Sequence, residues 1–432
     1  MRLRDSLFGV RGEMIMLPLD GVRVVDLTRA YAGAGATRLL GDMGAEIIKV
    51  ESCRIPDVIR GDIKNPDLEW LYPDNDPGEK PYNRAARHHG TNRNKYAITI
   101  ELDMPDGIDI FIELVKISDV VISSFPVGTM EGLGLSYEKL KQIKPEIIVA
   151  CMSAFGEGGP ESGYRAFGVT QFQLSGLANL FGYPNEEPIR NPMSPGDTVG
   201  AVNGAIAIML ALIHRKNTGK GQYIDLSQLE TMVSLIGETV MDYTVNGVME
   251  GRVGNRSSWI VPHGCYPCKG EDEWVSIAVA SDKEWHKFCQ VSDHLEWAED
   301  ERFADLLSRW ENQEQLDKLV ADWTVKYSKF EIMQMLQKED IACMAVVNNK
   351  EMYSDPQLQS RGFYVDITHP EIGTYPFPGV ECRLSETPGS IRMPAPDFAE
   401  HNDYIFKELL GMDDVYISKL RETGVIGDEP VG

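Results

Sequence analysis

Hydrophobic and polar positions follow two distinct rhythms through the first half of the chain. Apolar runs that suit strands cover residues 22–27, 45–50, 97–102, 119–123 and 146–152. Between them, apolar residues recur every three to four positions over 34–43 and 107–117, which is the spacing of one helix face. Strands that alternate with helices favour parallel pairing, so this half predicts an α/β, Rossmann-like sheet with both faces covered.

The second half begins with predicted helices, after which its amino-acid composition changes. The predicted elements are helices at 198–215 and 228–243, strands at 222–226 and 274–280, a mostly helical acidic stretch at 283–340, and a last helix near 402–410. Gly, Asn, Trp and Pro cluster over 251–270, where the composition shifts. This shift predicts a second, smaller domain.

Acidic residues outnumber basic ones by a wide margin. The 432 residues carry 42 Lys and Arg against 66 Asp and Glu, a net charge of −24, with an ordinary 43% of hydrophobic residues. Such a surface repels phosphate backbones and anionic lipid, so neither nucleic acid nor a membrane is expected as a partner. The longest apolar run, 199–213, is shorter than a membrane span requires and contains Asn203, which favours a buried core helix.

The N-terminal residues and the cysteines predict a cytoplasmic protein. The first 21 residues lack a clean apolar segment followed by small residues, so no secretory leader is expected. Seven scattered cysteines do not form a disulfide framework and fit a reducing compartment. Cys265 and Cys268 form a CxxC pair, but no second ligand pair accompanies them. No metal site is predicted, and the simpler interpretation is two small residues in a loop or at a strand edge.

The first turn resembles a dinucleotide fingerprint but departs from it. Gly33 and Gly35 follow a strand, and Glu51 comes about 20 residues later at the end of the next strand. The third glycine position carries Arg38, and the six residues from Thr28 to Gly33 stand where the fingerprint requires a tight turn. NAD or FAD binding is therefore not favoured. What remains is that small residues allow close approach to a helix N-terminus, where anions are stabilised.

A second candidate is Asp197, in Ser194-Pro195-Gly196-Asp197 just before the long apolar helix. The simpler interpretation is an N-cap that accepts hydrogen bonds from first-turn amides. The alternative is a carboxylate nucleophile, because a helix N-terminus stabilises the ionised form and nearby glycines leave room for a bulky thioester. Spacing alone does not separate these two interpretations.

Other catalytic patterns are weak. No G-x-S-x-G elbow occurs, and the eight histidines lie in ordinary contexts, so a serine hydrolase is not expected. The basic residues Arg93, Lys95, Lys139, Lys141 and Lys144 suit solvated faces, with phosphate contacts as the alternative.

Several long motifs, in consistent order, resemble those of class III CoA-transferases of the CaiB/BaiF type, relatives of formyl-CoA and L-carnitine CoA-transferases. They are PLDGVRVVDLTRAYAGAGATRLLGDMGAEIIKVE at 18–51, NRNKYAITIEL, DVVISSFPVGTMEGLGLSYEKLKQIKPEIIVACMSAFG, SPGDTVG, HRKNTGKGQYIDLSQLE, DPQLQSRGF and LSETPGSIRMPAPDFAEHND. The resemblance extends from residue 18 to about 411, which covers most of the chain.

This resemblance implies an architecture. A large Rossmann-like, CoA-binding domain is expected at 17–228 and 353–432, with an inserted small α+β domain at 250–338 and linkers at 229–249 and 339–352. Two protomers are expected to interlock, each threading the other, as a homodimer or as a heteromer with a related subunit. The active site is expected between the large domain of one protomer and the small domain of the other.

The resemblance also implies a reaction. Asp197 matches the catalytic carboxylate, which would form a mixed anhydride and then an aspartyl-CoA thioester. Coenzyme A and acyl-CoA are expected as substrates, with no permanently bound cofactor. The residues that match CoA-contact positions are Ala30, Tyr31, Ala32, Ile100, Ser124 and Phe125.

The chain departs from the family pattern near the nucleotide end of CoA. Ser52, Tyr96 and Gly132 stand where the family often has Arg or another base. Either Arg38, Arg93 and Lys95 hold the phosphates instead, or this subunit binds CoA weakly beside a more typical partner.

Three alternatives to a transferase stay open at this point. A 2-methylacyl-CoA racemase of the same fold needs a His about thirty residues before the Asp, and Phe167 occupies that position here. A thioester hydrolase and a non-catalytic subunit are the others, although retention of Asp197 speaks against the second. Succinyl-CoA is one candidate donor, and the sequence does not identify the two acids.

Overall fold

The computed structural model describes residues 16–61, 68–189, 191 and 193–431. Residues 1–15, which include most of the segment used to predict that no secretory leader is present, lie outside the described residues. The chain divides into two compact units, and each is described by itself. The larger takes residues up to 177, 190–241 and from 361 onward, and the smaller takes 178–189 and 242–360. The domain bounds and linkers inferred from the sequence stay a prediction.

The larger unit is built on a parallel sheet. Its strands within the described residues are β1 (Arg23–Leu27), β2 (Glu46–Glu51), β3 (Lys95–Thr99), β4 (Val120–Ser123), β5 (Ile148–Ser153) and β6 (Tyr223–Ser227). They pair in the order β3-β2-β1-β4-β5-β6, and every pairing is parallel. The prediction of a parallel α/β sheet is confirmed.

Strand β3 begins two residues earlier than the apolar pattern predicts. Its first residue is Lys95, a charged residue that precedes the predicted apolar run. In the structure the Lys95 side chain is fully buried and its ammonium group lies 3.2 Å from the Asp26 carboxylate. At this strand position a buried ion pair therefore stands where an apolar side chain would be expected.

Both faces of the sheet are covered. Helices α1 (Ala32–Asp42) and α9 (Pro195–Thr218) pack on the face that carries Val24, Ile47 and Ile148. The opposite face carries residues such as Val25 and is covered by α4 (Pro105–Lys116), α6 (Tyr137–Ile143), the π-helical segment Tyr404–Leu409 and α19 (Asp414–Glu422). Neighbouring residues of one strand thus enter different cores, as the two-residue period of a strand requires.

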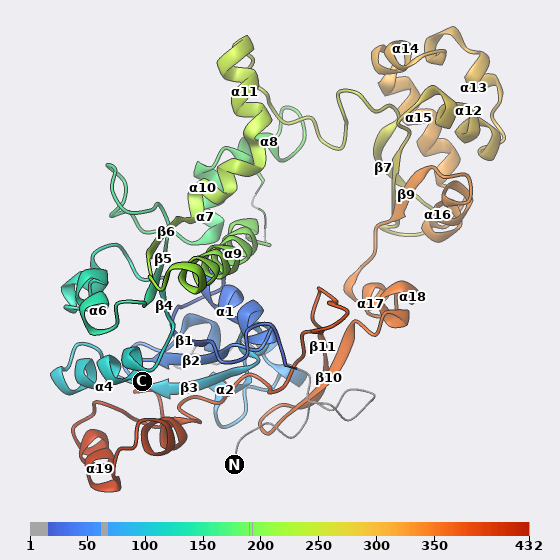
Figure 1. Cartoon of the computed structure of the whole chain (residues 1–432). Helices are drawn as coiled ribbons and strands as arrows, with labels where there is room; N and C mark the ends of the chain where they lie inside the picture. The colour runs from blue at the N-terminus through green and yellow to red at the C-terminus, as the bar shows by residue number, and fades with distance from the viewer. Residues whose placement is uncertain (1–15, 62–67, 190, 192, 432) are drawn as a thin grey trace. The chain divides into compact units, whose positions relative to one another are not determined.

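Helices α1 and α9 lie side by side and run in the same direction (Figure 1). A Cβ placed on Gly35 would lie 3.0 Å from the Cβ of Ala201, and one placed on Gly200 would lie 3.6 Å from that of Ala32. Small residues at these positions let the two backbones approach closely. Because early residues of α1 face early residues of α9, the N-termini of both helices lie at the same end.

The two faces of α9 differ in exposure. Small residues such as Gly204 and Ala205 pack against the unit, whereas the outward face exposes Val202, Ile206, Met209, Leu210 and Ile213. The prediction of a buried core helix is therefore right for one face only. By length and composition α9 could also cross a membrane, since an 18-residue window has a mean hydropathy of 1.6 and is 39% buried. A core helix of a soluble protein passes the same test, so this is weak support for a span.

The remaining helices of the larger unit are short. Their bounds are α2 Pro81–Arg84, α3 Ala86–Asn92, α5 Thr129–Gly132, α7 Gly168–Leu174 and α10 Gln228–Val233. The single helix predicted at 228–243 is interrupted by the tighter turn Ser234–Ile236, after which α11 (Gly237–Asn246) continues. The hairpin of β10 (Tyr364–His369) and β11 (Gly373–Pro378) was not predicted, and neither was α19.

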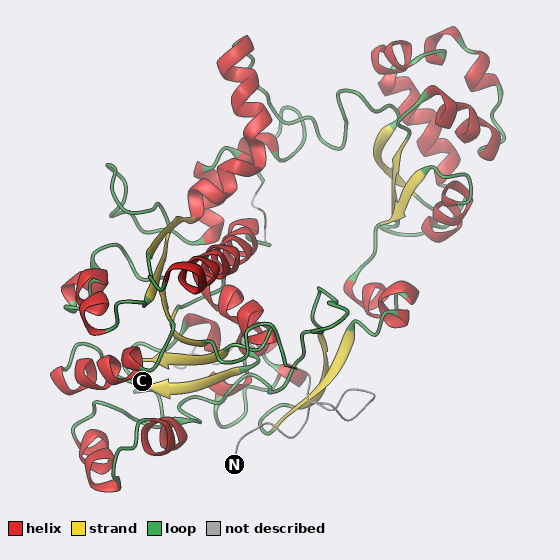
Figure 2. Ribbon diagram, in the orientation of Figure 1, coloured by secondary structure: helices red, strands yellow, loops and turns green. Residues whose placement is uncertain are grey.

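The smaller unit has a core of its own. Strands β7 (His263–Pro267), β8 (Trp274–Ala278) and β9 (Ala342–Ala345) form an antiparallel sheet with helices packed on it (Figure 2). The helices assigned to this unit, not all of which touch the sheet, are α8 Leu177–Leu180, which starts at the boundary of the unit, α12 Asp282–Val291, α13 Glu296–Glu299, α14 Leu306–Glu311, α15 Gln313–Thr324, α16 Lys329–Gln337, α17 Asn349–Tyr353 and α18 Pro356–Ser360. Buried aromatic residues, among them Trp285 and Trp323, fill this core.

Candidate active site

The loops that follow β1 and β4 meet at the carboxyl edge of the sheet. These strands are neighbours at the point where the strand order reverses, which is where α/β sheets of this type bind ligands. The backbone N–H of Arg29 donates a 2.9 Å hydrogen bond to the Ser124 hydroxyl, which joins the two loops. Ala30, Tyr31, Ala32, Ser124 and Phe125, all inferred from the sequence as CoA contacts, therefore come together at this edge.

Asp197 lies in the first turn of α9, and the N-cap residue is Ser194. The N-cap interpretation of Asp197 is therefore wrong. Ser194 has φ 47°, in the left-handed region that non-glycine residues rarely adopt, and its side chain does not cap the helix. Strained residues of this kind gather at functional sites, where the surroundings hold them in place.

A glycine lies against the Asp197 carboxylate, and a second one allows close packing beside it. A Cβ placed on Gly168, at the start of α7, would lie 2.5 Å from Asp197 Oδ2 and 2.7 Å from Ser194 Oγ. A Cβ on Gly196 would lie 2.6 Å from the sulfur of Met232. The Asp197 carboxylate thus occupies a space that exists because residue 168 lacks a side chain.

Burial raises the pKa of Asp197, and a hydrogen bond with the Ser194 side chain opposes the shift without cancelling it. The N-termini of α9 and α1 both point toward this end of the unit, and a helix N-terminus favours negative charge. A carboxylate with a raised pKa is a stronger nucleophile than an ordinary aspartate.

Tyr31 is the residue that precedes α1, and it lies within electrostatic range of Asp197. Burial raises the pKa of the Tyr31 hydroxyl, Arg87 lowers it, and the charge of Asp197 raises it again. The parallel packing of α1 on α9 explains this proximity, because Tyr31 and Asp197 stand at the beginnings of the two helices. A half-buried phenol beside a carboxylate can donate a hydrogen bond in the reaction.

Two predicted phosphate contacts are buried away from this edge. Arg93 precedes β3 and pairs with Asp42 at 2.7 Å, and Asp42 is the last residue of α1. Both therefore lie at the amino edge of the sheet. Lys95 is fully buried, and burial lowers its pKa to about 8 against the opposing effect of Asp26. The prediction of solvated faces is wrong for Arg93 and Lys95, and neither side chain reaches a surface where a phosphate could bind.

The remaining residues that were predicted to lie near CoA have the following surroundings. Arg38 lies on α1, with its guanidinium 2.9 Å from Glu381 and 3.5 Å from Asp42. Ile100 follows the last residue of β3 and is buried in the core that faces α4. Of the positions that depart from the family pattern, Ser52 donates a hydrogen bond to Glu101, and Tyr96 stacks on Tyr404.

The acidic residue of the apparent dinucleotide fingerprint has another partner. Glu51 forms a buried ion pair with Arg60 at 2.7 Å, with a second hydrogen bond from Arg60 Nε. The carboxylate that would hold a ribose is thus already engaged. This agrees with the rejection of NAD or FAD binding.

The CxxC pair lies in the smaller unit. Cys265 is on β7, and Cys268 follows that strand and enters the core. Among the residues that the structure describes, no three His, Cys, Asp or Glu side chains are grouped so as to hold a metal ion.

Two features in and beside this site were not predicted from the sequence. Gly168 gave no signal, because its contact with Asp197 joins segments nearly thirty residues apart. The buried ion pair between Lys49 and Asp57 did have a signal in the sequence, because Lys49 is a charged residue inside the apolar run AEIIKV. A charge within a strand that is buried on both faces indicates a buried partner.

Comparison with known proteins agrees with this geometry. The family model described as CoA-transferase family III matches residues 19–402. The chain is 32% identical over 410 residues to a succinyl-CoA–D-citramalate CoA-transferase of Chloroflexus aurantiacus, which covers 95% of this chain and 98% of that protein. It is 30% identical to the alpha and the beta subunit of a succinyl-CoA–L-malate CoA-transferase of the same organism, covering 95% and 96% of this chain and 93% and 100% of those subunits.

A solved structure of a CaiB/BaiF family protein from Brucella suis matches the chain with a TM-score of 0.80 at 30% identity. The match covers 91% of this chain and 99% of that one. The resemblance inferred from the motifs is confirmed, and so is the prediction of an enzyme of the CoA-transferase class. The chain belongs to CoA-transferase family III.

Proposed function

We propose that this enzyme moves coenzyme A from an acyl-CoA donor to a carboxylic acid through a covalent aspartyl-CoA thioester on Asp197. The observation that carries the proposal is the position of Asp197: a half-buried carboxylate in contact with Gly168, where the N-termini of α1 and α9 meet. Desolvation makes the carboxylate nucleophilic, and the missing side chains leave room for a thioester.

The reaction balances without an added proton or redox partner. A carboxylate oxygen of Asp197 attacks the thioester carbonyl, the C–S bond breaks, and a mixed anhydride and CoA thiolate form. The thiolate then attacks the Asp197 carbonyl carbon, which releases the donor acid and leaves aspartyl-CoA. The acceptor carboxylate attacks this thioester, forming a second anhydride and freeing the thiolate again. Attack of the thiolate on the acceptor's acyl carbon yields the new acyl-CoA and restores the Asp197 carboxylate.

Each attack places negative charge on a former carbonyl oxygen. Preorganised backbone N–H groups and hydroxyls that face this charge lower the barrier. The donors that we propose are the N–H groups in the first turn of α9, the Ser194 hydroxyl, which hydrogen-bonds with Asp197, and the Tyr31 hydroxyl, which interacts electrostatically with it.

The structure supports a transferase over a racemase. Phe167 immediately precedes Gly168, whose position contacts Asp197, so residue 167 does lie next to the site. A racemase needs a second proton carrier there, and a phenyl ring cannot accept or donate a proton.

The donor that we propose is succinyl-CoA. The three Chloroflexus aurantiacus sequences described above carry succinyl-CoA in their names. Their acceptors differ, so the acceptor for this chain is stated only as a carboxylic acid.

We also propose that the protein works as a dimer with a second chain of the same family. The outward face of α9 presents Val202, Ile206, Met209, Leu210 and Ile213 at helical spacing, which is an apolar stripe too regular for scattered surface residues. Because one relative consists of related alpha and beta subunits, the second chain is either another copy or a homologous subunit.

The test is mass spectrometry of the purified protein after incubation with succinyl-, glutaryl-, acetyl- or benzoyl-CoA, followed by hydroxylamine trapping. The expected result is a modified peptide that contains Asp197 in the wild type and not in Asp197→Asn. Asp106→Asn is the matched control, because Asp106 also follows a proline in the first turn of a helix. An Asp197 peptide that stays unmodified with every donor, in a protein that binds CoA, contradicts the mechanism.

A further inference from the structure

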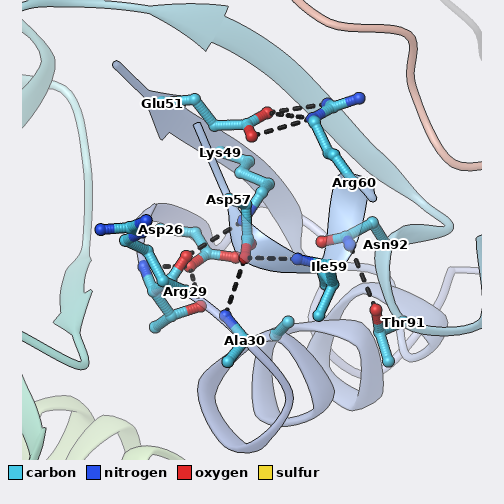
Figure 3. A network of polar contacts seen from close by, with 12 residues as sticks. Asp26, Arg29, Ala30, Lys49, Glu51, Asp57, Ile59, Arg60, Thr91 and Asn92 are labelled. Carbon is cyan, nitrogen blue, oxygen red and sulfur yellow. Dashed lines mark hydrogen bonds and ion pairs between the residues drawn. The ribbon is translucent and has the colours of Figure 1, made fainter. Parts of the chain in front are cut away.

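A buried ion pair lies beside the candidate site without taking part in the reaction described above. Lys49 Nζ is 2.8 Å from Asp57 Oδ2, and the side chains are 0% and 1% exposed (Figure 3). Lys49 belongs to β2, whereas Asp57 lies in the segment that follows it. Burying two charges costs desolvation free energy. The pair also forms hydrogen bonds to residues outside itself.

Both partners also bind the turn that follows β1. Asp57 Oδ1 accepts a 2.8 Å hydrogen bond from the Ala30 N–H, and Lys49 Nζ donates a 3.0 Å bond to the Thr28 carbonyl. The residue between them, Arg29, is held by Ser124 through its backbone and by the Pro56 carbonyl through its side chain. Each residue from 28 to 30 therefore has at least one fixed hydrogen bond.

The turn requires a left-handed backbone conformation at Ala30, which alanine disfavours. Ala30 has φ 62°, in the left-handed region that L side chains rarely adopt. Such a conformation persists where the surroundings overdetermine it. The hydrogen bond from Ala30 to Asp57 is one of the contacts that do so.

The next residue is Tyr31, where the chain turns into α1. The direction of this turn decides where Tyr31 stands relative to Asp197. The close packing of α1 on α9 limits the distance between Tyr31 and Asp197, since a Cβ on Gly200 would lie 3.6 Å from the Cβ of Ala32. A change of φ at Ala30 would swing Tyr31 away while leaving α1 in place.

We propose that Lys49 and Asp57 are positioning residues of the transferase: their ion pair fixes the left-handed turn at Ala30 and thereby holds Tyr31 beside Asp197. This inference rests on the proposed function of Asp197. Neither residue is catalytic, because both are buried and act on the reacting groups through the turn.

The experiment compares two buried ion pairs on the same strand. Lys49→Met breaks the pair that holds the turn. Arg60→Met breaks the neighbouring pair with Glu51, which is equally buried and contacts Tyr82, Asn83 and Pro396 instead. For each variant, the rate of Asp197 modification is measured against the concentration of the acyl-CoA that modifies the wild type fastest. Binding of free coenzyme A and the Tm are measured in parallel.

We expect Lys49→Met to lower the maximum rate of Asp197 modification roughly 30- to 100-fold, because displacement of a reacting geometry by about 1 Å has effects of this size. The affinity for free coenzyme A should change less than about threefold. Arg60→Met should lower the Tm to a similar degree and leave the maximum rate within about threefold of wild type. Equal losses of rate in both variants would overturn the proposal, because a general loss of stability would then explain them.

Where Lys49→Met does not fold, Asp57→Asn and Glu51→Gln make the same comparison with smaller changes. A second-site variant adds a further test. Glycine adopts a left-handed φ without strain, so Ala30→Gly introduced into Lys49→Met should restore part of the lost rate. No recovery, in a double variant that folds, would count against a role through the turn.

Failure of the proposed function is separate from failure of this inference. If wild type forms no Asp197 adduct with any acyl-CoA, the covalent mechanism is wrong. The positioning claim is then decided by the crystal structure of Lys49→Met, in which Ala30 should leave its left-handed conformation and Tyr31 should move away from Asp197. An unchanged turn in that structure would overturn it.

Discussion

Gly168 and Asp197 are in direct contact across two helix starts, and a Cβ on residue 168 would lie 2.5 Å from Asp197 Oδ2. No rearrangement short of moving the carboxylate or the backbone relieves such an approach. The glycine at 168 is thus part of what gives Asp197 its position.

The first prediction concerns this contact. Gly168→Ala should lower the maximum rate of Asp197 modification roughly 10- to 100-fold, because the added methyl group displaces the reacting carboxylate. Gly90→Ala is the control, since Gly90 also lies in a short helix and a Cβ there meets nothing within 4 Å. The two rates are compared by mass spectrometry at saturating acyl-CoA. A Gly168→Ala enzyme as fast as the control would show that the carboxylate can shift without loss.

The second prediction concerns pH. The reaction needs ionised Asp197, and the pKa of this group is raised by burial and held down in part by Ser194. The acidic limb of kcat/KM should therefore lie above pH 3.8. Ser194→Gly removes the hydroxyl without adding strain at a left-handed φ, so the pKa of Asp197 should rise further and the limb should move to higher pH. The pH profiles of both proteins check this, and a shift to lower pH would contradict it.

The third prediction concerns stability. Because the pKa of Asp197 is higher in the folded state than in the unfolded state, the folded state binds the proton more tightly. Stability from this group is therefore present at low pH and is lost as the pH rises through the folded pKa. Asp197→Asn should raise the Tm by about 1–3 °C at pH 7.5 while abolishing adduct formation, as is common for strained functional residues. The gain should shrink as the pH falls toward 4, which thermal melts at several pH values measure.

The fourth prediction concerns the apolar face of α9. Leu210→Glu places a charge in the stripe that we propose to be covered by a second chain, so self-association should weaken at least about tenfold. Analytical ultracentrifugation measures this. Val415→Glu is the matched control, because Val415 is an isolated exposed apolar residue on α19, and it should leave the association unchanged. A wild-type protein that is monomeric alone but pairs with a homologous subunit would indicate the heteromer.

The sequence by itself determined the parallel sheet, most strand positions, the family and Asp197 as the candidate nucleophile. These follow from short-range patterns: the period of apolar residues fixes element type, and the order of long motifs fixes the family. The resemblance to the family pointed to Ala30, Tyr31, Ala32, Ser124 and Phe125 as CoA contacts, and the structure brings them to one edge of the sheet because they follow the neighbouring strands β1 and β4.

Only the tertiary structure decided the rest. Whether Arg93 and Lys95 meet solvent depends on the burial of Asp42 and Asp26, and sequence spacing carries no information about that pairing. Gly168 contacts Asp197, and the Asp57 carboxylate accepts a hydrogen bond from Ala30. Both contacts join segments from different parts of the chain. The energy of a buried charge or a close approach depends on which groups surround it in space, and that is settled when the elements pack.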